Sequence, residues 1–584
     1  MNGIERRRSF LKYAGVLGLP VLSGCCLFGP REIVPYCPNS GAVSDLKAEL
    51  TIDVHAHVFN GTDLPVKRFL ELVMSRQVGV PGSVAAIIGA LLQTAAWSNA
   101  PKAREELAEL EKIKLKLATC GDRSGQPAIS TLVQAMADRA FRNAVQELTN
   151  ALNASPALKS ARRKVQDQAL ALDMKIQAEA AVADEIELVS KMPTYGDYRK
   201  YLGSAAAGEG LVAIARISAR GAIAFVIQNF QYRYVSVHDY LGLYNVPGKR
   251  VIDLLMPMMV DYDWWLAGGS PTASSLAGQV ETMEQMAIVT GGRVHAFVPF
   301  DPLREVAFGL HLAPSSSLEL VKDALDRGCI GVKLYPPMGF AALGNKRLQE
   351  RSPAFWRQEW FDERLLLPDL GQRLDTALRS LYRHCVDNDI PIMAHTAQSN
   401  GPSGDFEGLA AAEYWACALK EFPGLRINFG HFGDTGFGGS EASAYVRAKE
   451  FAGLMQVNGV GRNAYADSGY FIEAVDHKES FKTAIAQLIK ETDGKGSASL
   501  ANRFMYGTDW EMTITQGHIE SYLANFEEVF ESKLVARKFF GENAADFAGL
   551  RNGQPTRLRL QKFYDRHQIP TPDWMRKIDQ PKAA

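Results

Sequence analysis

The chain has 584 residues, of which 47% are apolar and 22% charged, so it is long enough for one elaborated globular domain or for two or three domains. Its formal net charge is −1, and it contains no basic stripe with interleaved aromatic residues, which excludes nucleic acid as an expected partner. No internal repeat recurs at a fixed period.

The N-terminal segment has the layout of an export signal. A basic start precedes an apolar run too short for a transmembrane helix, and small residues follow before Cys25. The stretch "RRSFLK" (Arg7–Lys12) resembles the twin-arginine signal, and "LSGC" (Leu22–Cys25) resembles the lipobox of bacterial lipoproteins. We therefore expect a signal peptide over 1–24, acylation of the Cys25 thiol, and a lipid-anchored protein on the periplasmic or outer face of a bacterial cell envelope. A soluble secreted protein cut nearby is the alternative.

The other cysteines show no C-x-x-C spacing. Cys329, Cys385 and Cys417 lie in apolar segments and are expected to be buried thiols. Export would allow disulfides, but the sequence leaves the pairing of the remaining cysteines open.

A long helical stretch follows the first predicted strand. Residues 66–245 are rich in Ala, Glu, Lys and Leu, with apolar residues three and four apart, which is typical of amphipathic helices. The run 211–230 is apolar but contains Arg216 and Arg220, so it predicts a buried helix and not a membrane span. Residues 25–48 precede the fold as an irregular tether.

From about residue 250, short β-rich runs alternate with helical patterns, which is typical of parallel βα units. With a first strand that begins at Ile52, the runs number eight, the number that closes a (β/α)8 TIM barrel. The predicted α/β barrel consists of 49–65 and 246–550, with 66–245 as a helical insertion after strand 1 and 551–584 as a C-terminal tail.

Polar side chains gather at the C-terminal ends of the predicted strands, where TIM barrels carry their chemistry. The stretch "TIDVHAHVFNG" (51–61) places Asp53, His55 and His57 on one face of strand 1, because side chains in a strand repeat every two residues. Later strands end in Lys333, His395, His431, Asp467 and Asp509. Imidazole and carboxylate ligands suit one divalent ion, with zinc expected and a position left for water. The predicted ligands are His55, His57, His395 and Asp509.

These motifs, in order, resemble the amidohydrolase superfamily. They are D-x-H-x-H on strand 1, then "GVKLYPP", "AHT", "GHFG", "YGTDW" and "GENAADFAGL". The most similar branch is the amidohydrolase-related group that contains aminocarboxymuconate semialdehyde decarboxylase and resorcylate decarboxylases. The resemblance implies the same metal ligands and gives the strand 6 histidine, His431, a role as acid/base or polarising group beside the metal-bound water.

Two cationic residues are candidates for binding substrate. In binuclear members of the superfamily a strand 4 lysine is carbamylated and bridges two metals; Lys333 could do this, or bind a substrate carboxylate or a strand-end acid. Arg462 is the second candidate for an anionic group. Asp301, before Pro302, is expected to form a turn.

The leading functional hypothesis is a metal-dependent hydrolase that cleaves an ester, amide or lactone in a small carbonyl substrate, with Asp509 and His431 as catalytic groups. A non-oxidative decarboxylase of a small carboxylic acid is the alternative, and a non-catalytic binding lipoprotein is a third hypothesis. The insertion leaves the barrel on the same side as the metal, so it is expected to cover the mouth, with a dimerisation or membrane platform as the alternative. The oligomeric state is left open.

Overall fold

The computed structural model describes the chain from residue 48 onwards with gaps. The described ranges are 48–58, 60–65, 68–73, 99–117, 125–167, 174–205, 219–244, 249–439, 442–456, 460–492, 499–515 and 521–580. The export signal, the tether up to residue 47 and Cys25 lie outside the described residues, so the predictions for them stay predictions. No helix in the described part is long and apolar enough to cross a bilayer.

Eight parallel strands form the barrel predicted from the sequence. Strands β3 to β8 pair in chain order, and β1 pairs with β2. Bridges from Leu255 to Val294 and from Met258 to Phe297 join β2 to β3, and a bridge from Ala56 to Trp510 joins β1 to the segment after β8. The barrel is therefore closed. The strands are β1 (Ile52–Ala56), β2 (Leu254–Pro257), β3 (Phe297–Pro299), β4 (Gly331–Leu334), β5 (Ile392–His395), β6 (Ile427–Gly430), β7 (Ala464–Asp467) and β8 (Phe504–Met505).

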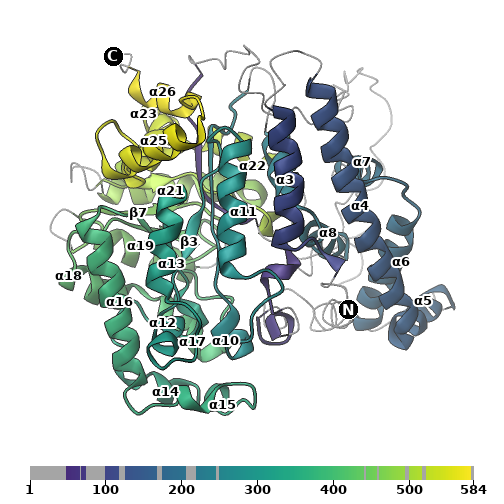
Figure 1. Ribbon diagram of the computed structural model, residues 1–584, viewed down its shortest axis with the longest axis horizontal. Coiled ribbons are helices and arrows are strands. Elements are labelled where there is room, and N and C mark those ends of the chain that lie inside the picture. The colour runs from purple at the N-terminus through teal and green to yellow at the C-terminus, as the bar shows by residue number, and fades with distance from the viewer. Residues whose placement is uncertain are drawn as a thin grey trace, which may run out of the picture. The chain divides into compact units, whose positions relative to one another are not determined.

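Helices between these strands cover the outside of the barrel (Figure 1). In their sequences apolar residues recur every three or four positions, so each helix has an apolar face that is buried against the sheet. In α16, for example, Leu374, Leu378, Leu381 and Cys385 are buried. The longer ones are α11 (Leu276–Val289), α12 (Pro302–Gly309), α13 (Ser317–Asp326), α16 (Leu370–Asp387), α18 (Ala412–Glu421), α19 (Ala442–Leu454), α21 (Lys478–Thr492) and α22 (Tyr522–Val529). Shorter ones are α10 (Asp263–Ala267), α14 (Leu348–Arg351), α15 (Pro353–Trp356), α17 (Gly404–Glu407), α20 (Glu473–Asp476), α23 (Lys533–Arg537) and α24 (Asn543–Phe547).

One cysteine prediction is wrong. Cys329 and Cys385 are buried thiols as expected, but Cys417 is exposed. On α18 the buried face carries Trp415, Ala418 and Leu419, and residue 417 lies on the other side of the helix. An apolar neighbourhood in the sequence does not by itself decide which face of a helix a residue occupies.

The described residues between β1 and β2 are mostly helical, and in Figure 1 they lie beside the barrel. Helix α3 packs along the outer helix α11, while α8 packs on the short helix Met512–Thr515 that follows β8. The insertion therefore touches both the outside of the barrel and the loop that carries Asp509. Its helices are α3 (Ala103–Leu117), α4 (Gly125–Ala154), α5 (Pro156–Asp167), α6 (Met174–Ser190), α7 (Tyr195–Ala205), α8 (Ala219–Asn229) and α9 (Arg233–Leu243).

The predicted C-terminal tail forms two helices, α25 (Pro555–His567) and α26 (Asp573–Asp579). Trp574 Nε1 donates to the carbonyl of Gly292, and Lys577 pairs with Asp253 at 2.7 Å. Both partners precede their strands, so the two helices lie at the N-terminal ends of β2 and β3. This leaves the opposite, C-terminal ends for the site.

Candidate metal centre

The ring of His55, in β1, is tightly packed and hydrogen-bonded. Its Nδ1 lies 3.0 Å and 3.1 Å from the two carboxylate oxygens of Asp467, at the end of β7, so Nδ1 carries the proton and Nε2 presents a lone pair. Two glycines make room for the ring. A Cβ at Gly469 would lie 2.4 Å from Nδ1, and one at Gly507 would lie 2.7 Å from the Cβ of His55.

His57 and Asp509 complete the nearest part of the cluster. His57 Nδ1 lies 3.1 Å from the carbonyl of Met258, which again leaves the Nε2 lone pair free of a proton. Asp509 Oδ1 lies 3.3 Å from His57 Nε2 and 3.6 Å from His55 Nε2. Both His55 Nε2 and Asp509 Oδ1 are buried and accept no hydrogen bond from the described residues. Acceptor atoms that face one another out of water repel unless a cation lies between them, so this donor set fits a divalent metal ion.

His431 belongs to the same cluster. His55, His431 and Asp509 each offer one ligand atom, and these three atoms lie within 4.8 Å of one another. His431 Nδ1 donates to the carbonyl of Gly469 at 2.9 Å, so its Nε2 is the acceptor. His431 is thus placed to serve as a ligand or as the acid/base group expected from the sequence.

His395, the predicted strand 5 ligand, contacts His431. Its Nδ1 is 3.1 Å from His431 Nε2 and must donate to it, which leaves His395 Nε2 as an acceptor 3.5 Å from Ser399 Oγ. Tyr335 stacks on the His395 ring with centroids 4.3 Å apart. The structure brings His395 to the site, and its role as a ligand stays a prediction.

Burial keeps His57 and His431 neutral, and the carboxylate of Asp509 stays charged. Burial lowers the pKa of His57 and lowers the pKa of His431 to about 4. Burial would raise the pKa of Asp509, but its interactions with His57 and the neighbouring rings outweigh burial and hold that pKa below its usual value. Neutral imidazole and ionised carboxylate are the forms that bind metal.

The backbone at two of these residues is strained. His431 and Asp509 have φ angles of 63° and 57°, in the left-handed region that costs a non-glycine residue of order 1 kcal/mol or more. Such strain persists where the surroundings fix the conformation, and both side chains belong to the cluster.

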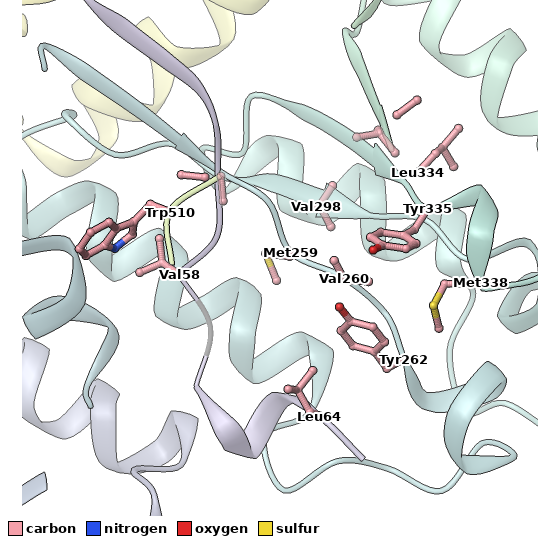
Figure 2. Packing of buried hydrophobic residues seen from close by; sticks show 14 of the residues in the cluster. Val58, Leu64, Met259, Val260, Tyr262, Val298, Leu334, Tyr335, Met338 and Trp510 are labelled. Carbon is pink, nitrogen blue, oxygen red and sulfur yellow. The ribbon is translucent and has the colours of Figure 1, made fainter. Parts of the chain in front are cut away.

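Lys333 lies beside the cluster, in β4. Its Nζ is buried and has no hydrogen-bond partner among the described residues, and burial lowers its pKa to about 8. It borders a cavity of about 10 Å³, room for about one water molecule. Figure 2 shows Tyr335, Val260 and Met338, which line this cavity, next to Tyr262. The full lining is Val260, Asp261, Trp265, Pro299, Phe300, Asp301, Lys333, Tyr335, Met338 and Phe340.

The expectation that Arg462 binds substrate is wrong. Arg462 is exposed and precedes the first residue of β7, Ala464, so it lies at the N-terminal end of that strand, away from the cluster. Asp301, by contrast, has the turn role expected of it: it caps α12 and accepts a hydrogen bond from the amide of Leu303 at 2.9 Å.

Two functional contacts were not foreseen. Asp467 was noted only as a strand-end residue, yet it orients His55 and also accepts from Asn428 Nδ2 at 2.6 Å. Residues of α9 in the insertion contact Asp53 and the residues after Asp509. The position of Asp467 at a strand end was a usable signal; no local pattern marked the residues of α9.

The closed barrel places imidazoles and carboxylates at the C-terminal ends of its strands. Residues 301–550 match the model of a family described as Amidohydrolase, which confirms for this range the resemblance predicted from the motifs, and the family implies a divalent metal. A comparison with curated proteins gives no match.

Solved structures with similar folds include hydrolases and decarboxylases. A probable 2-pyrone-4,6-dicarboxylic acid hydrolase from Acinetobacter baumannii shares 13% identity over 54% of this chain and 89% of its own, with a TM-score of 0.32. A 5-carboxyvanillate decarboxylase from Novosphingobium aromaticivorans, complexed with manganese, shares 15% over 51% and 76%, with a TM-score of 0.30. An amidohydrolase from Burkholderia multivorans with bound zinc shares 11% over 51% and 83%, with a TM-score of 0.28. At these scores the likenesses carry no weight for substrate or metal.

Proposed function

We propose that this chain is a zinc-dependent hydrolase that cleaves an ester, amide or lactone bond in a small carbonyl compound. The observation that carries the proposal is the approach of His55 Nε2 and His57 Nε2 to Asp509 Oδ1, at 3.6 Å and 3.3 Å, where His55 Nε2 and Asp509 Oδ1 are buried and have no hydrogen-bond partner among the described residues. These residues would hold the ion, together with His431 or His395. A zinc ion held there would supply a bound water whose pKa is lowered from 15.7 to about 7, and would polarise a carbonyl.

The protein's own groups handle the proton. Asp509 has a second carboxylate oxygen, which can take a proton from an attacking water and return it to the leaving group. His431 Nε2 accepts from His395 Nδ1 at 3.1 Å, so His431 can take a proton only once that hydrogen bond is released. Asp467 keeps the lone pair of His55 directed at the site by fixing the proton on Nδ1. Tyr335 and Lys333 border the side of the site next to β4, where Tyr335 stacks on His395.

Decarboxylation of a small carboxylic acid is the second candidate, and Lys333 favours it. A decarboxylase needs a cation to hold the carboxylate of its substrate, and Lys333 Nζ is a buried amino group without a hydrogen-bond partner among the residues described. Incubation of the metal-loaded protein with ester, amide, lactone and aromatic carboxylate panels tests both candidates. Water-dependent cleavage supports the hydrolase, and release of carbon dioxide supports the decarboxylase.

We also propose that the protein is exported by the twin-arginine route and anchored through lipid on Cys25. The sequence motifs at Arg7–Lys12 and Leu22–Cys25 support this proposal. A zinc enzyme benefits from that route because it carries proteins that have already folded.

A further inference from the structure

One face of α9, in the helical insertion, is turned toward acidic residues of the barrel. Arg233, Ser236 and Tyr240 are three and four residues apart, so they lie on the same side of the helix. Arg233 pairs with Asp63, Ser236 Oγ donates to Glu511 Oε1, and Tyr240 OH donates to Asp53 Oδ2. All six residues are buried.

Asp53 connects this helix to both ligand-bearing segments. Its Oδ1 accepts from the amide of His55 at 3.0 Å and from the amide of Thr508 at 3.2 Å. Its Oδ2 accepts from Thr508 Oγ1 at 2.6 Å and from Tyr240 OH. One carboxylate thus ties the strand that carries His55 and His57 to the residue that precedes Asp509, and Tyr240 fixes the position of that carboxylate.

Trp510, the residue that follows Asp509, also contacts α9. Trp510 Nε1 lies 3.3 Å from Ser236 Oγ, and the rings of Trp510 and Tyr240 have centroids 5.2 Å apart. The carbonyl of Trp510 accepts from the amide of His57. Asp509, whose φ is positive, therefore lies between Thr508, which α9 contacts through Asp53, and Trp510, which α9 contacts directly.

We propose that Tyr240 is a positioning residue of the metal centre: acting through Asp53, it sets the separation between the histidines of β1 and Asp509. The insertion is then part of the metal site. This inference rests on the proposed function, because it takes His55, His57 and Asp509 as metal ligands. A metal site loses affinity for its metal by roughly 10- to 100-fold when the groups that orient its ligands are removed.

The variant Tyr240→Phe tests the proposal, because it removes the hydroxyl and keeps the ring against Trp510. We expect the full-length variant to bind zinc roughly 10- to 100-fold more weakly in competition with a chromophoric chelator. The matched control is Tyr198→Phe in α7, which removes a buried hydroxyl that has no hydrogen-bond partner in the described residues. It should bind zinc as the unaltered chain does, although it too changes a buried tyrosine of the insertion.

A double-mutant cycle separates positioning from general stability. In an Asp53→Ala background, Tyr240→Phe should cause no further loss of zinc affinity, because the carboxylate through which it acts is gone. Ser236→Ala is a second measurement: it removes the contacts of the same face of α9 with Glu511 and Trp510, and if Tyr240→Phe does not fold it tests whether this face positions the centre. Unchanged zinc affinity in the folded variants overturns the inference. Failure of the unaltered chain to bind zinc would instead overturn the proposed function.

Discussion

The carboxylate of Asp467 accepts the Nδ1 proton of His55 at 3.0 Å, and this bond determines which nitrogen of His55 faces Asp509. The two residues come from β1 and β7, more than 400 positions apart in sequence. Their contact is close because Gly469 and Gly507 leave no side chain beside the ring. The orientation of this proposed metal ligand depends on backbone positions that carry no side chain.

The substitution Gly469→Ala should displace His55. The added Cβ would lie 2.4 Å from Nδ1, closer than any normal contact, so the ring must move away from Asp467. We expect zinc affinity to fall at least about 10-fold and the free energy of unfolding to fall by about 1–3 kcal/mol. Gly453→Ala, in α19 with nothing within 4 Å of the added Cβ, is the control and should leave both unchanged or raise stability slightly. Equal zinc affinity in the two variants would show that the ring is not confined.

Replacement of Lys333 by Met should weaken substrate binding and leave the metal in place. Lys333 Nζ is buried beside the site and forms no hydrogen bond with the residues described, so an anionic group of the substrate is its expected partner. A hydrogen bond to a charged group contributes about 1.5–3 kcal/mol, which corresponds to a loss in kcat/KM of roughly 10- to 100-fold. The metal content of the same variant distinguishes a Lys333 that binds substrate from a Lys333 that helps to hold the metal. Loss of metal would show instead that Lys333 helps to hold the metal, as the carbamylated alternative requires.

Stability should fall as the pH falls, in part because of His295. Burial lowers the pKa of His295 to about 4 from the usual 6.5, and its ring bonds Gly328 O and Tyr564 OH in the neutral form. Between these values the unfolded chain binds a proton and the folded chain does not, so folding is favoured at higher pH. At pH 5 this costs about 2 kcal/mol relative to neutral pH. Urea unfolding of the metal-free protein at both pH values measures it, and His295→Gln should show a shallower dependence on pH. The same slope in that variant would assign the effect to other groups.

Much of the barrel could be predicted because the strands are short buried runs with polar residues at or near their C-terminal ends. The alternation of His55 and His57 and the order of Lys333, His395, His431 and Asp509 identified one end of the sheet. Arg462 was assigned wrongly because it lies close to β7 in sequence but before the strand, and sequence proximity does not distinguish the two ends. The contacts of Asp467 and Tyr240 depend on pairing across the closed barrel and with the insertion, which no local pattern encodes.

The proposed lipid anchor predicts the behaviour of Cys25→Ser. Without the thiol that is acylated, the exported protein should no longer sediment with membranes, since no described helix can span a bilayer and provide another anchor in that part of the chain. Fractionation of cell envelopes before and after a high-salt wash measures this. A variant that stays with the membrane after the wash would assign the anchor to another segment.

The metal content of the purified protein tests the central claim most directly. Elemental analysis should find about one divalent ion per chain, and His57→Ala and Asp509→Ala should each lose both the ion and the activity, because each removes an acceptor atom from the cluster in which His57 Nε2 lies 3.3 Å from Asp509 Oδ1. The matched control, Arg462→Ala, alters an exposed residue at the other end of β7 and should keep the ion. Full metal content in both ligand variants would contradict the account.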